Sequence, residues 1–158
     1  MFTRFLKDAR DVATQARTVA KGMGSATIEA EHLLLAVARL PGPAAEALGG
    51  AGLDQGAIRD ALEDETERSL GAVGVSLSAF EATSTAEDAR EPRFASSAKL
   101  AFERSLKIAE ARKDRRIGPA HILAGVLSAE LGTVPRALEC AGIERDHLLD
   151  RVKATLDG

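Results

Sequence analysis

Two histidines are the residues of this 158-residue chain whose chemistry is most conspicuous, because imidazole binds metals and transfers protons near neutral pH. His32 and His121 each precede an aliphatic run. Neither has a second ligand at a helical spacing that recurs in both places, and Cys140 is the only cysteine. We therefore expect no metal and no cofactor. We interpret each imidazole as a buried group that hydrogen-bonds a helix start or a loop carbonyl.

Other catalytic arrangements are equally sparse. No serine lies in a Gly-x-Ser-x-Gly elbow, the turn that exposes a hydrolase nucleophile. Cys140 can form no internal disulfide, and we interpret it as a small core residue. The residues thus give little support to nucleophilic catalysis.

The surroundings of the two histidines are copies of each other. His32 and His121 are 89 residues apart (121 − 32 = 89), and this separation holds from the first helical segment through the aliphatic run. After one inserted residue it becomes 90, as between Gly52 and Gly142 (142 − 52 = 90). A register kept through four segments means that one helical unit was built twice, so we expect a pseudo-symmetric fold with paired surfaces.

Each copy has the pattern of four helices. Apolar spacing and breakers predict helices at about 3–21, 30–40, 43–48 and 54–70, and again at about 96–109, 118–127, 133–138 and 144–156. The expected N-caps include Asp54, Ser96 or Ser97, and Thr133. Pro43 and Pro119 suit first-turn positions.

The stretch between the copies, residues 71–92, is rich in Gly, Ser, Thr, Ala and acids, so it is predicted to be a linker. Alternation of Val73, Val75 and Leu77 indicates an extended stretch on the surface. Residues 81–91 are expected to be mobile. The whole chain, 1–158, is expected to form one domain, with a first repeat at 2–70 and a second at 93–157.

Composition limits the partners. The net charge is −3, the pI is near 5.7 and aromatics are only 3%, which argues against a nucleic-acid partner. The basic run 112–116 is interpreted either as a solvated helix end or as an anion site. No apolar run reaches the length of a membrane span and no signal peptide is visible, so we expect no membrane partner and a cytoplasmic location.

The repeated Ile-x-x-x-His-Leu/Ile-Leu motif, preceded by Phe-x-x-x-Ala-Arg/Lys, resembles the double Clp N-terminal repeat. That domain receives substrates and adaptors at the front of AAA+ unfoldases, and the ClpC type is the most similar. The resemblance implies an all-α fold of eight helices, in two four-helix repeats related by a pseudo-twofold axis. It also implies no catalysis, since the Gly-Lys-Ser/Thr phosphate loop of the ATPase modules is absent from these 158 residues.

In ClpC-type domains a glutamate before the histidine of each repeat helps to bind phosphoarginine. The resemblance carries this role to Glu31, with Glu29 beside it, whereas the second repeat has Ala120. Pro119 also removes an N–H donor there. At most one phosphoarginine pocket is therefore expected. The alternative is that Glu31 only complements the helix dipole.

The family's other binding surface receives adaptors and cyclic-peptide antibiotics, where the first helices of the two repeats meet. The resemblance carries it to Phe2, Arg10, Phe94 and Lys99, of which the two cations are symmetry mates. The alternative is that both phenylalanines fill the core and the cations are solvated.

The predicted function is a non-enzymatic module of the Clp proteolytic system that binds substrates, adaptors or peptides for recruitment, sequestration or regulation. Its partners would be Clp unfoldase or protease components, protein substrates and adaptors, and cyclic peptides. Two forms stay open, a free-standing protein and the N-terminal domain of a ClpC-like ATPase. The alternative is a regulatory helical protein that dimerises or docks on a Clp unfoldase without binding peptide.

Overall fold

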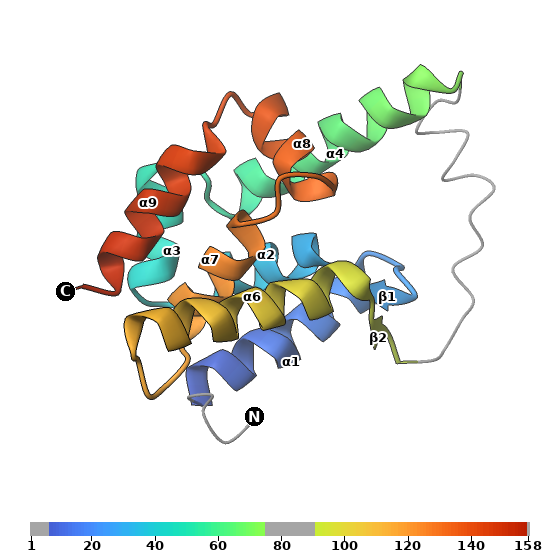
Figure 1. Cartoon of the computed structure of the whole chain (residues 1–158). Helices are drawn as coiled ribbons and strands as arrows, with labels where there is room; N and C mark the ends of the chain where they lie inside the picture. The colour runs from blue at the N-terminus through green and yellow to red at the C-terminus, as the bar shows by residue number, and fades with distance from the viewer. Residues whose placement is uncertain (1–6, 75–90, 158) are drawn as a thin grey trace.

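The computed structural model describes residues 7–74 and 91–157, and Figure 1 shows the arrangement of their helices. These residues contain eight helices and one pair of short strands, which confirms the all-α class. The first unit contains α1 (Lys7–Gly22), β1 (Thr27–Ile28), α2 (Ala30–Arg39), α3 (Pro43–Gly50) and α4 (Gln55–Ala72). The second contains β2 (Arg93–Phe94), α6 (Ser96–Arg112), α7 (Pro119–Leu127), α8 (Thr133–Cys140) and α9 (Arg145–Thr155). Phe2, Val75 and Leu77, which were named above, lie outside the described residues, and so do residues 81–90 of the predicted linker.

The core is built around α2 and α7, which carry the aliphatic run of each copy and contact each other at the centre of the molecule (Figure 1). Every residue of α7 from His121 to Leu127 is buried, and so is α2 from His32 to Val37. Their apolar residues are not confined to one stripe, because other helices cover them on several sides. The remaining helices shield this pair from water.

Contacts between the two units come in matched pairs, as a twofold axis requires. Helix α4 packs on α8, and α9 packs on α3, so the fourth helix of each unit covers the third helix of the other. In the same way α2 contacts α6 while α7 contacts α1. The pairing confirms two pseudo-twofold-related four-helix units and binds them into one core.

The turns that follow α1 and α6 are also equivalent. Ser25 N–H donates to Ala20 O at 2.9 Å after α1, and Asp114 N–H donates to Ala109 O at 2.9 Å after α6. Gly24 has φ 71° in the first turn, and Lys113 has φ 63° in the second. The second unit thus keeps a left-handed turn that in the first unit is made by glycine.

Not all local expectations hold. Asp54 caps α4, since its Oδ1 accepts the Ala57 N–H at 2.8 Å. The prediction of Thr133 as a cap is wrong, because Thr133 is the first residue of α8 and Gly132, with φ 118°, precedes it. Ser96 and Ser97 do not cap α6 either, since Ala95 holds that position. Cys140 is half-buried and not part of the core.

A short parallel strand pair joins the units and was not predicted. Thr27 pairs with Arg93, and Ile28 with Phe94. Two-residue strands give too little alternation to be recognised in a sequence. The pair places the beginning of α6 beside the beginning of α2, and this juxtaposition builds the groove described next.

Candidate functional site

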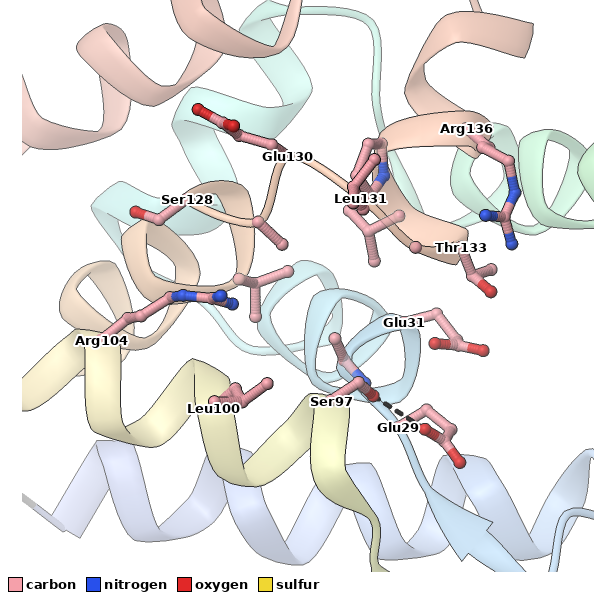
Figure 2. Close-up of a pocket in the computed structure, with 16 residues that line it drawn as sticks. Glu29, Glu31, Ser97, Leu100, Arg104, Ser128, Glu130, Leu131, Thr133 and Arg136 are labelled. Atoms are coloured by element: carbon pink, nitrogen blue, oxygen red, sulfur yellow. Dashed lines mark hydrogen bonds between the residues drawn. The ribbon is translucent and has the colours of Figure 1, made fainter.

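A groove of about 610 Å³ opens where the two units meet, a volume typical of ligand sites. Figure 2 shows the structural elements around it: the first turn of α2, the first three turns of α6, and the loop from α7 into α8 with the first turn of α8. Sixteen residues line it, among them both acids that the sequence analysis assigned to phosphoarginine, Glu29 and Glu31.

Glu29 is held by neighbours on both of its carboxylate oxygens. Thr27 Oγ1 donates to Oε2 at 2.7 Å, and Ser97 Oγ of the other unit donates to Oε1 at 2.8 Å. Ser97 Oγ also accepts the Ala30 N–H at 2.8 Å. These bonds join the start of α2 to the start of α6, so Glu29 shapes the groove more than it offers a free charge to a ligand.

Glu31 is the freer acid. Within the described residues its carboxylate forms no ion pair and accepts no hydrogen bond from another residue, and its only bonding partner is its own backbone N–H. Burial raises the pKa of the Glu31 carboxyl above its usual value, and the charges of Glu29 and Glu65 add to the rise, whereas the bond to its own backbone N–H and the charge of Arg136 oppose it. A half-buried carboxylate without an ion pair favours the binding of a cationic group.

Two arginines that the sequence analysis did not select also line the groove. Arg136 Nε donates to Glu65 Oε1 at 2.9 Å, and 55% of the Arg136 side chain stays exposed. Arg104 lies on α6 and is half-buried. Figure 2 shows its guanidinium directed along the groove from the end opposite Glu31. Their spacing in the sequence gave no signal, because Arg104 lies on α6 and Arg136 on α8 and only tertiary folding brings them to one groove.

The pseudo-symmetric counterpart of this groove exists but differs. It is about 250 Å³ and is lined by Gly118, Pro119, Ala120 and His121 at the start of α7, with the turn from α2 into α3 above them. Ala120 holds the place of Glu31, 89 residues on. The counterpart is smaller and lacks the acid, so the two grooves are not equivalent.

Three of the four residues predicted for the adaptor surface, Arg10, Phe94 and Lys99, lie within the described part of the chain, whereas Phe2 lies outside it. Phe94 packs edge-to-face on Phe102 with ring centroids 5.6 Å apart, and the Arg17 guanidinium lies 5.7 Å from the Phe94 ring centroid. Arg10 is exposed and stands two helical turns before Arg17, about 10 Å along α1. Lys99 is exposed on the first turn of α6. Phe94 is therefore partly a packing residue, and Arg17 is the cation beside it.

Both histidines bond helix starts, which confirms their predicted role. His32 Nδ1 accepts the Glu29 N–H at 2.8 Å, and His121 Nδ1 accepts the Gly118 N–H at 3.0 Å. His121 Nε2 also lies 2.8 Å from Asp114 Oδ2. Burial lowers the pKa of His32, which the charge of Glu29 partly offsets. Within residues 7–74 and 91–157 no group of His, Cys, Asp and Glu could hold a metal ion.

The basic run 112–116 begins inside a structural network. Arg112 Nε donates to Asp114 Oδ2 at 3.0 Å, and Arg112 Nη2 donates to Asp157 Oδ1 at 2.8 Å. Hydrogen bonds from His121 and Arg112 lower the pKa of the Asp114 carboxyl. This end of α6 is thus tied to the end of α9.

Among the described helices, none is long and apolar enough to cross a membrane.

Comparison with known proteins agrees with the repeat. The model of the Clp repeat N-terminal domain matches residues 4–90 and 93–158. The predicted repeat limits, 2–70 and 93–157, remain a proposal. They share only residue 93, the start of the second repeat, with the limits of the family match. Comparison with curated protein sequences finds no relative.

Three solved structures share the fold. The N-terminal domain of the ClpD chaperone from Arabidopsis thaliana has a TM-score of 0.71 at 23% identity, covering 100% of this chain and 97% of that one. A chain from a malarial protein secretion system has a TM-score of 0.64 at 14% identity, over 96% and 94%. The N-terminal domain of Hsp104 from Candida albicans has a TM-score of 0.62 at 18% identity, over 94% and 88%.

Proposed function

This chain belongs to the Clp repeat N-terminal domain family, and from that premise we propose that it is a non-enzymatic module that binds protein substrates or adaptors of a Clp proteolytic system. The observation that carries this proposal is the 610 Å³ groove with its unpaired, half-buried Glu31 carboxylate. A groove of this kind suits a cationic side chain of another protein, and nothing in it resembles a nucleophile with its base.

The first ligand proposed for the groove is phosphoarginine. A carboxylate and a guanidinium can form two parallel hydrogen bonds, which suits Glu31. The helix-start N–H of Ala30 is already taken by Ser97, so the phosphate needs another donor. Arg136 offers one, because the Glu65 bond uses its Nε and leaves much of its guanidinium exposed.

Calorimetric titration of the chain with free phosphoarginine tests this. We expect one site per chain and its loss in Glu31→Gln, because Ala120 leaves the counterpart groove without an acid. Glu63→Gln, an exposed acid on α4, is the matched control and should bind like wild type. Two sites would overturn the asymmetry, and no binding would overturn phosphoarginine as the ligand.

We propose a second site, for adaptors or cyclic peptides, that involves Phe2, Arg10, Phe94 and Lys99. Arg10 and Lys99 are both exposed and occupy equivalent positions of the two units, which favours a ligand placed near the pseudo-twofold axis. Calorimetry with a Clp-directed cyclic peptide on wild type and Phe2→Ala tests the assignment, and equal affinities would refute it.

The proposed partners are Clp unfoldase or protease subunits, together with the substrates and adaptors that those machines receive in the cytoplasm. Affinity capture on the immobilised chain, with the recovered proteins identified, should yield Clp subunits. Recovery of the chain alone would favour the alternative, a helical regulator that acts by self-association and does not bind peptide.

A further inference from the structure

The groove extends well beyond Glu31 along one face of α6. Ser97, Leu100 and Arg104 all line it, and their spacing of three and then four residues places them on one side of the helix. Seven residues of helix measure about 10 Å, which is the length of about three residues of extended chain. The floor of the groove is therefore long enough for a short peptide segment and not just for one side chain.

The two ends of this floor carry opposite charges, neither of which is in an ion pair with another described residue. Glu31 lies at the Ser97 end, and Arg104 lies at the far end (Figure 2). Within the described residues neither side chain forms an ion pair, whereas Arg136 and Glu29 at the same groove are both bonded. A half-buried guanidinium without a carboxylate favours an anionic group, as Glu31 favours a cationic one.

Between the charges the groove is apolar. Leu100 is 43% exposed on its floor, and Leu131, on the loop above, is 90% exposed. Most large apolar side chains of the described residues are buried, so two exposed leucines beside one groove point to a partner that covers them. That partner should contribute an apolar side chain midway between its two charges.

The pseudo-symmetric positions give an internal comparison. Glu31 corresponds to Ala120 in the second unit (120 − 89 = 31), and Arg104 corresponds to Gln15 in the first (104 − 89 = 15), so neither charge is repeated. The counterpart groove is also the smaller one, at about 250 Å³ against 610 Å³. Glu31 of the first unit and Arg104 of the second line the same groove, and the equivalent positions carry neither charge, which is consistent with a common ligand for the two.

Resting on the proposed function, we propose that this groove binds a short peptide segment in which a basic residue and an acidic residue stand three positions apart with an apolar residue between them. The basic side chain pairs with Glu31, the apolar one covers Leu100 and Leu131, and the carboxylate pairs with Arg104. The groove would therefore select the apolar and acidic residues of the peptide as well as its basic residue. A site that holds one side chain would select the basic residue alone.

The test uses fluorescence anisotropy at low salt with the whole chain and labelled, end-blocked peptides. One peptide is Gly-Arg-Leu-Ala-Glu-Gly, a second has the reverse order, and for each a version with Gln in place of Glu is prepared. Of the two Glu peptides, the one that binds wild type more tightly is used for the comparison. Its Gln version should bind wild type about threefold more weakly, which is the effect of one exposed ion pair. The same change should have no effect on Arg104→Gln. Lys107→Gln, on the exposed face of α6, is the matched control and should behave like wild type.

A charge exchange makes the test direct. Arg104→Glu should bind the Glu peptide about tenfold more weakly than wild type and should regain affinity when the peptide Glu is replaced by Lys. A preference for Glu over Gln that persists in Arg104→Gln, or the absence of any peptide binding, overturns the inference. If Glu31→Gln still abolishes phosphoarginine binding in that case, the proposed function stands without it. If phosphoarginine does not bind either, the proposed ligand has failed as well.

Discussion

The Ser97 hydroxyl of the second unit donates a hydrogen bond to Glu29 Oε1 of the first unit, with 2.8 Å between the two oxygens and 68 residues between the two positions. The same Ser97 oxygen accepts the Ala30 N–H at the first residue of α2. The Ser97 hydroxyl, in the first turn of α6, therefore bonds the backbone N–H at the start of α2 in the other unit. The groove has its shape because these two helix starts are joined at this point.

Ser97→Ala should lower stability. It leaves the N–H of the buried Ala30 without a partner and removes one of the two bonds to Glu29, at a cost of about 1–2 kcal/mol. The melting temperature should then fall by about 2–8 °C for a chain of this size. Ser96→Ala, at the exposed neighbouring position, is the control and should change stability by less than about 0.5 kcal/mol. Equal melting of the two variants would show that the Ser97 bond contributes nothing.

Gly125→Ala should be more damaging, because α7 approaches α6 closely at this glycine. A methyl group there would meet the Ala101 carbonyl oxygen and the Ser105 Oγ. Neither can retreat easily, since Ser105 is fully buried and bonded to Ala101 O at 2.7 Å. We expect a loss of about 1–3 kcal/mol in the free energy of unfolding by urea, as in other overpacked cores.

The matched control for Gly125 is Gly49→Ala, in α3. Nothing lies within 4 Å of a methyl group at Gly49. Alanine also has the better helix propensity, so stability should stay the same or rise by up to about 1 kcal/mol. A Gly125→Ala variant as stable as the Gly49→Ala variant would contradict the close approach of α6 and α7.

The sequence predicted the helices well because their signals are local. Apolar spacing, breakers and the Asp54 cap all act within a few residues, and duplication doubled every signal. The role of Ser97 could not be found this way, since its partners Glu29 and Ala30 lie in the other unit. Thr133 looked like a cap, yet the backbone of Gly132 makes the turn into α8.

The candidate site was predicted only in part, for the same reason. Glu31 followed from the family resemblance and from its place before His32. Arg104 and Leu131 belong to the groove only because the α7–α8 loop folds over α6, and no spacing in the sequence reports that approach. Residues that share a site through tertiary folding have no common periodicity to reveal them.

His32 should make the fold sensitive to acid. Its Nδ1 accepts the Glu29 N–H, so protonation of that nitrogen would set two donors against each other. Burial lowers the pKa of His32 in the folded state below the value near 6.5 of the unfolded chain. Stability from this group is therefore complete above about pH 6.5 and declines as the pH falls from there toward the folded pKa.

His32→Asn should flatten that dependence, because an amide oxygen can accept the same N–H but does not titrate in this range. Urea unfolding at pH 7.5 and pH 5.5 should show a smaller difference for His32→Asn than for wild type. His147 is exposed on α9, so His147→Asn should leave the wild-type difference unchanged. If His32→Asn and His147→Asn reduce the stability difference between pH 7.5 and pH 5.5 equally, helix capping by His32 is not the cause of the acid sensitivity.

Glu31→Gln should separate binding from stability. Burial raises the pKa of Glu31, so the folded protein holds this proton more tightly than the unfolded chain does. Ionisation of Glu31 therefore destabilises the fold as the pH rises through the unfolded pKa toward the folded one, and the full penalty is present at pH 7. The first-turn position of Glu31 favours a negative charge, but the raised pKa means that burial outweighs this effect. The Gln variant should thus melt at a higher temperature than wild type at pH 7.

This advantage of Glu31→Gln should disappear at pH 3.5, where wild-type Glu31 is also neutral. Glu63→Gln, at an exposed position, should show neither effect. A Glu31→Gln variant that melts below wild type at pH 7 would mean that this carboxylate stabilises the fold, and the argument for an uncompensated charge kept for a ligand would fail.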